Sequence, residues 1–124
     1  MRWVLFVEDD PLVARAALRY LARVPMDIRH AVGVNEALSL VDEHGHPGAV
    51  ITDFRLKDST NGATLIRALR DRAIDAPCVV WTGTVRATVD GALLGAGVRE
   101  ELLIFEKPEL KGLTDWLVAL TGSE

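Results

Sequence analysis

Charged and hydroxyl side chains stand at or just beyond the ends of several short apolar runs in this sequence. They are Glu8, Asp9, Asp53, Thr82 and Lys107. Carboxylates that lie close together repel one another unless a cation joins them, and hard oxygen ligands of this kind suit Mg²⁺. A lysine can neutralise phosphoryl oxygens, and a threonine hydroxyl can hydrogen-bond to one of them. Brought together, these groups would suit phosphoryl transfer, in which positioning and charge neutralisation supply most of the catalysis.

The apolar runs themselves predict five strands. They are Trp3–Val7, Ile28–Val32, Ala49–Thr52, Cys78–Thr82 and Leu102–Phe105. Four of them lack strict alternation of polar and apolar residues, which is typical of strands buried on both faces. The run 28–32 carries Arg29 and His30, and we expect it at an edge of the sheet.

Helical patterns separate the runs. Asp10-Pro11 predicts an N-cap and first-turn proline, followed by an apolar stripe formed by Leu12, Ala16, Ala17 and Leu21. Asn35 and Asn61-Gly62 predict the starts of the next two helices. In the third helix we expect Leu65, Ile66 and Leu69 to face inward and Arg67, Arg70 and Asp71 outward. The remaining patterns span Arg86–Leu94 and Lys111–Thr121.

Strand and helix therefore alternate five times, which predicts an α/β domain with a parallel sheet covered by helices on both faces. In such a sheet the functional site lies beyond the carboxyl ends of the strands, so the groups that follow the runs should meet there. The 124 residues suit one domain, 1–124.

Composition excludes several classes of protein. A formal net charge of −4 gives no basis for binding a nucleic-acid backbone. No apolar stretch reaches membrane length, and the single cysteine, Cys78, fits a reducing compartment. We therefore expect a soluble, cytoplasmic protein without direct nucleic-acid or membrane contacts.

The sequence resembles the response-regulator receiver domains of two-component signalling over nearly its whole length. Each shared motif is unspecific alone, but all four occur in order at the ends of predicted strands. They are Val7-Glu8-Asp9-Asp10-Pro11, Val50-Ile51-Thr52-Asp53-Phe54-Arg55-Leu56, Val79-Val80-Trp81-Thr82-Gly83 and Glu106-Lys107-Pro108. The resemblance implies a flavodoxin-like, doubly wound sheet of five parallel strands in the order 2-1-3-4-5, with five helices.

The resemblance also implies site roles. Asp53 would be the phosphoacceptor, attacking a phosphohistidine or a small acyl phosphate. Thr82 would be the switch hydroxyl and Lys107 the phosphate-binding lysine. Asp9 would bind Mg²⁺ directly and Glu8 through water. The implied protein ligands of the metal are Glu8, Asp9, Asp53 and the backbone carbonyl of Arg55.

A receiver is a phosphoacceptor that catalyses only its own phosphorylation and dephosphorylation. The implied donors are a sensor histidine kinase or a phosphotransfer protein. Output would pass to a protein partner through the surface of the fourth helix, fifth strand and fifth helix, or through a homodimer. The chain ends soon after the predicted fifth helix, so we expect no output domain. It could equally be a phosphate sink or a receiver excised from a hybrid kinase.

Some positions depart from the family pattern. Lys57 stands where many receivers have proline, in a loop that is longer by one residue. Ile104 stands where the family has an aromatic switch residue, and the adjacent Phe105 should point to the opposite face of its strand. The link 97–102 is longer than usual, and Arg55 places a cation two residues after the acceptor.

Three other functions compete with the receiver interpretation. A flavin- or nucleotide-binding protein needs a Gly or Ser/Thr cradle after the first strand, where this chain has acids. An aspartyl-phosphate hydrolase places a second acid two residues after a nucleophile that follows the first strand, whereas Asp53 follows the third run and precedes Arg55. A degenerate receiver that only binds proteins stays open because of Ile104, although Asp53 and Lys107 argue against it.

Overall fold

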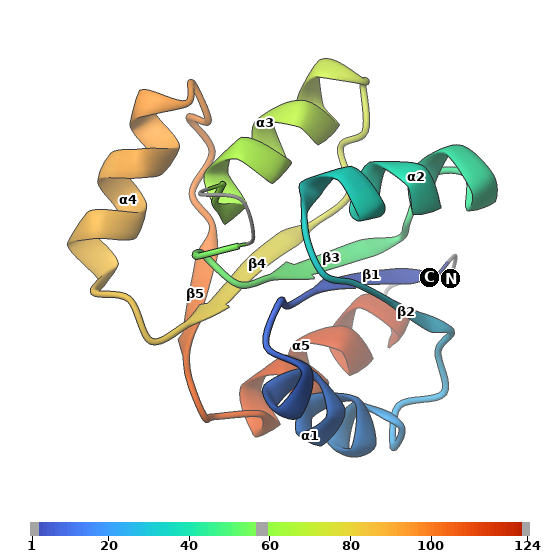
Figure 1. Cartoon of the computed structure of the whole chain (residues 1–124). Coiled ribbons are helices and arrows are strands. Elements are labelled where there is room, and N and C mark those ends of the chain that lie inside the picture. The colour runs from blue at the N-terminus through green and yellow to red at the C-terminus, as the bar shows by residue number, and fades with distance from the viewer. Residues whose placement is uncertain (1–2, 57–59, 123–124) are drawn as a thin grey trace.

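The computed structural model describes residues 3–56 and 60–122 of the chain. Strands and helices alternate along it (Figure 1). The strands are β1 (Val4–Val7), β2 (Ile28–Ala31), β3 (Ala49–Thr52), β4 (Cys78–Thr82) and β5 (Leu103–Glu106). The helices are α1 (Pro11–Leu21), α2 (Val34–His44), α3 (Gly62–Asp71), α4 (Arg86–Gly95) and α5 (Lys111–Gly122).

The five strands form one parallel sheet in the order β2-β1-β3-β4-β5. This is the flavodoxin-like order, and the expectation from the sequence is confirmed. Figure 1 shows α2, α3 and α4 over one face of the sheet and α1 and α5 over the other. The strand order reverses between β1 and β3, and a crevice at the carboxyl ends of these two strands is the usual place for a site in such a sheet.

Two apolar layers form the core, one on each face of the sheet. Every residue of β1, β3 and β4 is buried, which explains why their sequences lack alternation. The two outer strands are more exposed: β2 is half-buried over most of its length, and Leu103 of β5 is 53% exposed. The prediction that the run carrying Arg29 and His30 forms an edge is therefore confirmed.

The predicted apolar stripe of the first helix was partly wrong. Leu12 is 73% exposed and Ala16 is also exposed, whereas Ala14, Ala17 and Leu21 are buried. The buried residues follow one another at intervals of three and four and share one side of the helix, whereas Leu12 and Ala16 lie on the other side. Asp10 caps the helix as predicted, through Oδ1, which accepts from the backbone N–H of Leu12 at 2.9 Å.

The predicted helix starts had different outcomes. The side chain of Asn61 caps α3 by accepting from the backbone N–H of Thr64 at 3.0 Å, as predicted. Asn35 does not cap α2, because this helix begins at Val34 and its N-cap is Gly33, which has no side chain to make the bond. In β5 the pairing with β4 begins at Leu103, one residue later than predicted.

Arg70 does not simply face solvent, as the sequence predicted. Its guanidinium folds back over the end of α3 and donates to the carbonyls of Ile74 at 2.8 Å and Ala76 at 3.1 Å, and it also pairs with Glu100. The residues that accept from it follow α3 or α4 in the chain, so helical periodicity could not reveal them. Among the residues that the structure describes, no helix is long and apolar enough to cross a membrane.

Candidate functional site

The register of the sheet gathers the groups that follow β1 and β3. Val7 pairs with Thr52, so the next residues along the two strands are neighbours at the same edge. The backbone N–H of Asp53 donates to the carbonyl of Val7 at 3.0 Å, which fixes this neighbourhood. On the other side of β3, Thr82 of β4 pairs with Glu106 of β5, and Lys107 follows directly.

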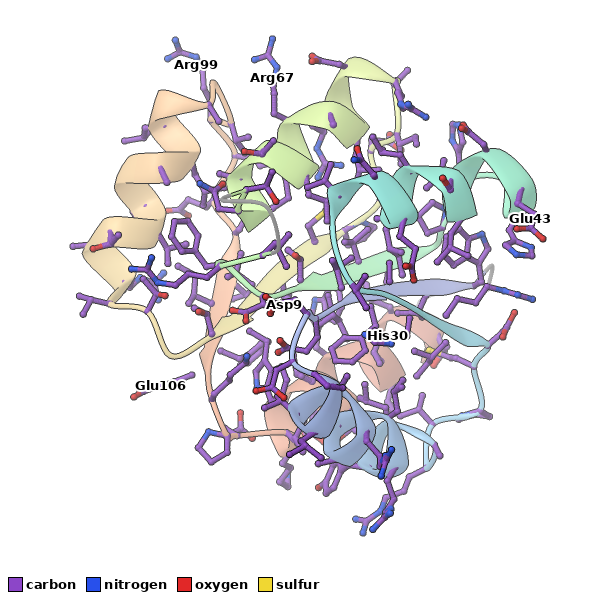
Figure 2. The ribbon with its side chains drawn as sticks, viewed as in Figure 1. Asp9, His30, Glu43, Arg67, Arg99 and Glu106 are labelled. Atoms are coloured by element: carbon purple, nitrogen blue, oxygen red, sulfur yellow. The ribbon has the colours of Figure 1, made fainter. Side chains whose placement is uncertain are left out.

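Three carboxylates meet at this edge. One oxygen each from Glu8, Asp9 and Asp53 can be chosen so that all three lie within 4.8 Å of one another. We call these residues the acidic trio. Glu8 is 1% exposed and Asp53 8%, whereas Asp9 is half-buried and lies near the middle of Figure 2, at the ends of the central strands. This arrangement places negative charge where little water can screen it.

Glu8 is the most buried acid of the trio. Burial raises the pKa of the Glu8 carboxyl, as does the charge of Asp53, while hydrogen bonds from Lys107 and the backbone N–H of Asp10 act in the other direction. The bond from Asp10 is 3.1 Å long. Because the net shift is upward, ionisation of Glu8 is less favourable here than in water, and a further cation nearby would favour the ionised form.

Lys107 bridges two members of the trio. Its ammonium donates to Oδ2 of Asp53 at 2.9 Å and also to Oε1 of Glu8. Burial favours the neutral amine, but the hydrogen bonds to Glu8 and Asp53 outweigh it and raise the pKa of Lys107. This lysine is therefore charged at neutral pH, and one ammonium faces three carboxylates.

Asp53 is held firmly by its own surroundings. Its Oδ1 accepts from the backbone N–H of Phe54 at 2.6 Å, and its carbonyl accepts from the hydroxyl of Thr52 at 2.8 Å. The start of α3 packs against the same carbonyl, since a Cβ added to Gly62 would lie 2.7 Å from it. Glycine is required there for this close approach of backbone to backbone.

An open pocket of about 460 Å³ lies beside Asp53. It is lined by groups from three loops at the carboxyl edge: Asp53, Arg55, Thr82, Gly83, Thr84, Val85, Thr88 and Lys107. The hydroxyl oxygen of Thr82 accepts from the backbone N–H of Thr84 at 3.1 Å. The pocket thus presents a carboxylate at its base, two cationic side chains and several hydroxyls to any group that enters it.

The acidic trio fits a magnesium ion. Its donors are carboxylate oxygens from two adjacent strand ends, the ligand chemistry that Mg²⁺ prefers. It is also the one group of three or more acidic, histidine or cysteine side chains with this spacing among residues 3–56 and 60–122. His44 and His46 belong to no such group.

The structure brings together all the site residues that the sequence singled out: Glu8, Asp9, Asp53, Thr82 and Lys107. Arg55 lines the same pocket with its exposed side chain. The predicted departure at Lys57 falls outside the described residues.

Sequence reasoning missed three residues that support the site. Gly62 was identified only as a helix start and Trp81 only as core. His30 was identified only as an edge-strand residue, yet its Nε2 donates to the backbone carbonyl of Glu8 at 2.7 Å. The ring centroid of Trp81 lies 5.0 Å from the Nζ atom of Lys107. None of these contacts is encoded in local spacing, because each joins residues from different elements.

Ile104 and Phe105 lie on opposite faces of β5, as predicted. Ile104 packs against the apolar layer that includes residues of α2, α3 and α4, and Phe105 packs against the layer of α1 and α5. Ile104 also lines a second pocket, of about 270 Å³, beside Thr82. An aliphatic side chain therefore occupies the position that an aromatic one has in many receivers.

One comparison with known proteins identifies the family. The family model described as response regulator receiver domain matches residues 4–110. No curated protein sequence matches the chain.

Solved structures share the fold at low identity. The receiver domain of the Francisella response regulator 1452 is 18% identical with a TM-score of 0.77, and the match covers 99% of this chain and 98% of that one. A CheY-like receiver domain protein from Methanospirillum hungatei is also 18% identical, with a TM-score of 0.75 and coverage of 100% and 99%. A putative response regulator from Chloroflexus aurantiacus is 24% identical, with a TM-score of 0.75 and coverage of 98% of each chain.

Members of this family are phosphoacceptors rather than conventional enzymes, and they bind Mg²⁺ in an acidic pocket of the kind that the trio forms here. Fold, site and family model agree, and the chain belongs to the response-regulator receiver domains of two-component signalling.

Proposed function

We propose that this chain accepts a phosphoryl group on Asp53, in a reaction that depends on Mg²⁺. The observation that carries the proposal is the bridge from Lys107 to Asp53 and Glu8 at the edge of an open pocket. A buried carboxylate that contacts a lysine and two further acids has the groups that a phosphoryl transfer needs. The whole stretch 1–124 acts as one receiver domain in this proposal.

In the transfer step, a carboxylate oxygen of Asp53 attacks the phosphorus of the donor. The bond from phosphorus to the donor's imidazole nitrogen or acyl oxygen breaks, the new bond joins phosphorus to Asp53, and the donor leaves with the electron pair. The hydrogen bond from the backbone N–H of Phe54 to Oδ1 keeps the carboxylate oriented for this attack. Lys107 balances negative charge on the phosphoryl oxygens.

The metal ligands in this proposal are the acidic trio and the backbone carbonyl of Arg55. When bound, Mg²⁺ neutralises charge on the trio and on the entering phosphoryl oxygens. Glu8 supports this assignment, because burial raises the pKa of its carboxyl and a cation nearby would favour the ionised form.

The product would change the hydrogen bonds at the edge of the pocket. The hydroxyl of Thr82 and the ammonium of Lys107 both face the space that a phosphoryl group on Asp53 would occupy. We infer that they turn to the new oxygens and shift the population of the loops after β4 and β5. Ile104 leaves unfilled space beside Thr82, which accommodates such a movement.

The proposed donors are a sensor histidine kinase or a phosphotransfer protein in the cytoplasm. The proposed output surface is the face formed by α4, β5 and α5, for a protein partner or a second copy of the chain. Exposed apolar side chains on all three elements support it: Leu94 is 67% exposed, Leu103 53% and Val118 54%. Isolated exposed apolar residues are common, but three on one proposed face suit a protein contact.

The test is an intact-mass measurement after incubation with Mg²⁺ and a small acyl-phosphate donor. The expected result is one added phosphoryl group per chain, absent when Mg²⁺ is chelated and absent in Asp53→Asn. Asp53→Asn keeps the size of the side chain and removes only the nucleophilic carboxylate. Asp115→Asn is the matched control, since this exposed acid of α5 forms an ion pair with Lys111 and lies outside the pocket.

A second donor makes the outcome decisive. If neither the acyl phosphate nor a phosphorylated histidine donor adds mass, and beryllofluoride with Mg²⁺ does not bind, the phosphoacceptor proposal is wrong. The chain would then use the receiver fold for binding alone. Mass added equally to wild type and Asp53→Asn would place the acceptor elsewhere.

A further inference from the structure

The side chain of Trp81 lies against Lys107, the lysine of the site. Trp81 is the residue before Thr82 in β4, it is 2% exposed, and it belongs to the apolar layer between the sheet and helices α1 and α5. Its ring contacts that of Phe6 at a centroid distance of 6.2 Å. The indole is therefore fixed in position by the core.

The face of this indole meets the ammonium of Lys107. The Nζ atom lies 5.0 Å from the ring centroid, inside the range in which a cation is attracted to an aromatic ring. The attraction does not use up an N–H group. Of the three hydrogens on the ammonium, one is directed to Glu8 and one to Asp53, and the third stays available for a phosphoryl oxygen.

The edge of the same indole holds the loop that carries Lys107. Its Nε1–H donates to the carbonyl of Glu109 at 2.7 Å. On the other side, the backbone N–H of Lys107 donates to the carbonyl of Thr82 at 3.1 Å. The chain is thus attached to β4 both at Lys107 and two residues beyond it, once through the Trp81 side chain.

We propose that Trp81 is a positioning residue for the phosphoryl transfer, acting through Lys107. Its ring face stabilises the ammonium beside Asp53, and its N–H holds the loop after β5 at the distance that this contact requires. The inference rests on the proposed phosphoacceptor function. It deepens that function by assigning a role to a side chain that otherwise belongs to the core.

Two substitutions separate the two contacts. Trp81→Phe keeps a ring face and removes the N–H, whereas Trp81→Leu removes both. Trp116→Phe is the matched control, because Trp116 packs against the same apolar layer from α5, whereas the ring that meets the Lys107 ammonium is that of Trp81. Each variant is measured for phosphorylation rate with an acyl phosphate at saturating Mg²⁺ and for affinity for beryllofluoride and for Mg²⁺.

We expect Trp81→Leu to slow phosphorylation about tenfold and Trp81→Phe about threefold, the range that a partly desolvated contact of this type spans. Affinity for beryllofluoride should fall in the same order. Affinity for Mg²⁺ should be equal to that of wild type or higher, because a released Lys107 competes less for the carboxylates. Trp116→Phe should match wild type in all three measurements.

The inference is wrong if both Trp81 variants fold and are phosphorylated at the rate of wild type. It is also wrong if they lose affinity for Mg²⁺ and beryllofluoride together, since that pattern indicates general loosening of the site. Trp81→Phe is the more conservative variant and decides the question if Trp81→Leu does not fold.

Emission of the indole tests the contact without any phosphoryl chemistry. The contribution of Trp81 is the difference between the spectra of wild type and Trp81→Phe, and Lys107→Met should change that difference because it removes the cation from the ring. An unchanged difference would contradict the inference even if wild type is phosphorylated. A wild type that accepts no phosphoryl group, with the emission change present, would instead contradict the proposed function.

Discussion

Two cationic side chains of this protein, Lys107 and Arg70, are both half-buried and both pair with carboxylates, but their surroundings differ. Arg70 directs its guanidinium to the carbonyls of Ile74 and Ala76 and to Glu100. Its N–H groups have acceptors in the turn after α3 and in the link after α4, and these bonds hold the two segments together. Lys107 faces Glu8 and Asp53, with Asp9 close by, and is outnumbered by acids.

The difference separates structure from function. A cluster such as that of Arg70 holds the corner between α3, the link after α4 and the start of β4, and the charge of its guanidinium is balanced by Glu100. The cluster of Lys107 has three buried or half-buried acids beside one lysine, and this excess of negative charge costs stability. A cation is the partner that would balance this charge, and with a cation bound the site would also tolerate the negative charge of a phosphoryl group.

The largest effect should follow from removing the functional cation. We expect Lys107→Met to slow phosphorylation of Asp53 on the order of 100-fold, the usual effect of deleting one group that stabilises developing charge. Initial rates with an acyl phosphate measure it. Lys111→Met, which removes an exposed lysine of α5, should keep the wild-type rate. Equal rates for Lys107→Met and wild type would show that Lys107 has no part in the phosphoryl transfer.

The converse substitution should affect stability and not activity. Arg70→Met leaves the carbonyls of Ile74 and Ala76 without this donor, and we expect a loss of about 2.5 kcal/mol in the free energy of unfolding. Arg70→Lys should recover little of it, since an ammonium cannot reproduce the planar fork. Urea unfolding measures the loss.

The control for Arg70 is Arg72→Met. Arg72 makes an exposed pair with Asp42, and its removal should change stability by under about 0.5 kcal/mol. The phosphorylation rate of folded Arg70→Met should equal that of wild type. Slow phosphorylation of fully folded Arg70→Met would show that the corner held by Arg70 is coupled to the site around Asp53.

Two glycines sharpen the comparison at the level of the backbone. Gly62→Ala places a Cβ 2.7 Å from the carbonyl of Asp53, and backbone cannot move aside as a side chain can. We expect a loss of about 2 kcal/mol in stability together with slower phosphorylation. Thermal unfolding and initial rates measure the two effects.

Gly97 is the matching position in the link after α4. Its φ of +82° and the nearby guanidinium of Arg67 predict a loss of about 1 kcal/mol for Gly97→Ala, at an unchanged phosphorylation rate. In Figure 2 Arg67 projects outward from α3, and because its side chain is half exposed it can move aside more easily than backbone can. If Gly97→Ala slowed phosphorylation as much as Gly62→Ala, the division between the two regions would be wrong.

The smallest effects should come from the two acids, and they should have opposite signs. Burial raises the pKa of Glu8 in the folded protein, so stability from this group is lost as pH rises above its unfolded value near 4.5. Glu8→Gln should therefore gain about 1 kcal/mol at neutral pH without Mg²⁺, and the gain should vanish below that pH. Chemical unfolding of Glu8→Gln and wild type across pH 3–8 measures the difference.

Glu100 should behave in the reverse way. The hydrogen bond from Arg70 lowers the pKa of this carboxyl, so its contribution is present above the unfolded value and is lost as pH falls through the lowered one. Because the side chain is 41% exposed, Glu100→Gln should lose under about 0.5 kcal/mol. A stabilised Glu100→Gln or a destabilised Glu8→Gln would contradict the account of the two charge clusters.

The sequence predicted most of this fold because local signals agree with it. Continuous apolar runs marked the buried strands, and Asp10 and Asn61 marked two helix starts through cap chemistry that is local. Asn35 misled because α2 uses a glycine cap that leaves no side-chain signal. Leu12 misled because the buried side of α1 is the one formed by Ala14, Ala17 and Leu21, and Leu12 lies on the other side of the helix.

The residues of the site could be predicted from the sequence, but the contacts that hold them in place could not. Parallel strands end at one edge, so the side chains that follow them can be grouped from the sequence alone. The contacts of Arg70 with Ile74 and Ala76 depend on a turn geometry that no periodicity encodes. The contact of Trp81 with Lys107 crosses between strands, so nothing in either segment alone points to it.

The identity of Asp53 as the acceptor is tested most directly by locating the modification. After incubation with Mg²⁺ and an acyl phosphate, reduction with borohydride converts an aspartyl phosphate to homoserine, and peptide mass spectrometry finds the changed residue. The account predicts homoserine at position 53 in the complete reaction and none when Mg²⁺ or donor is withheld. Homoserine at Asp9 or Asp10, or at no position while the intact protein gains a phosphoryl group, would contradict it.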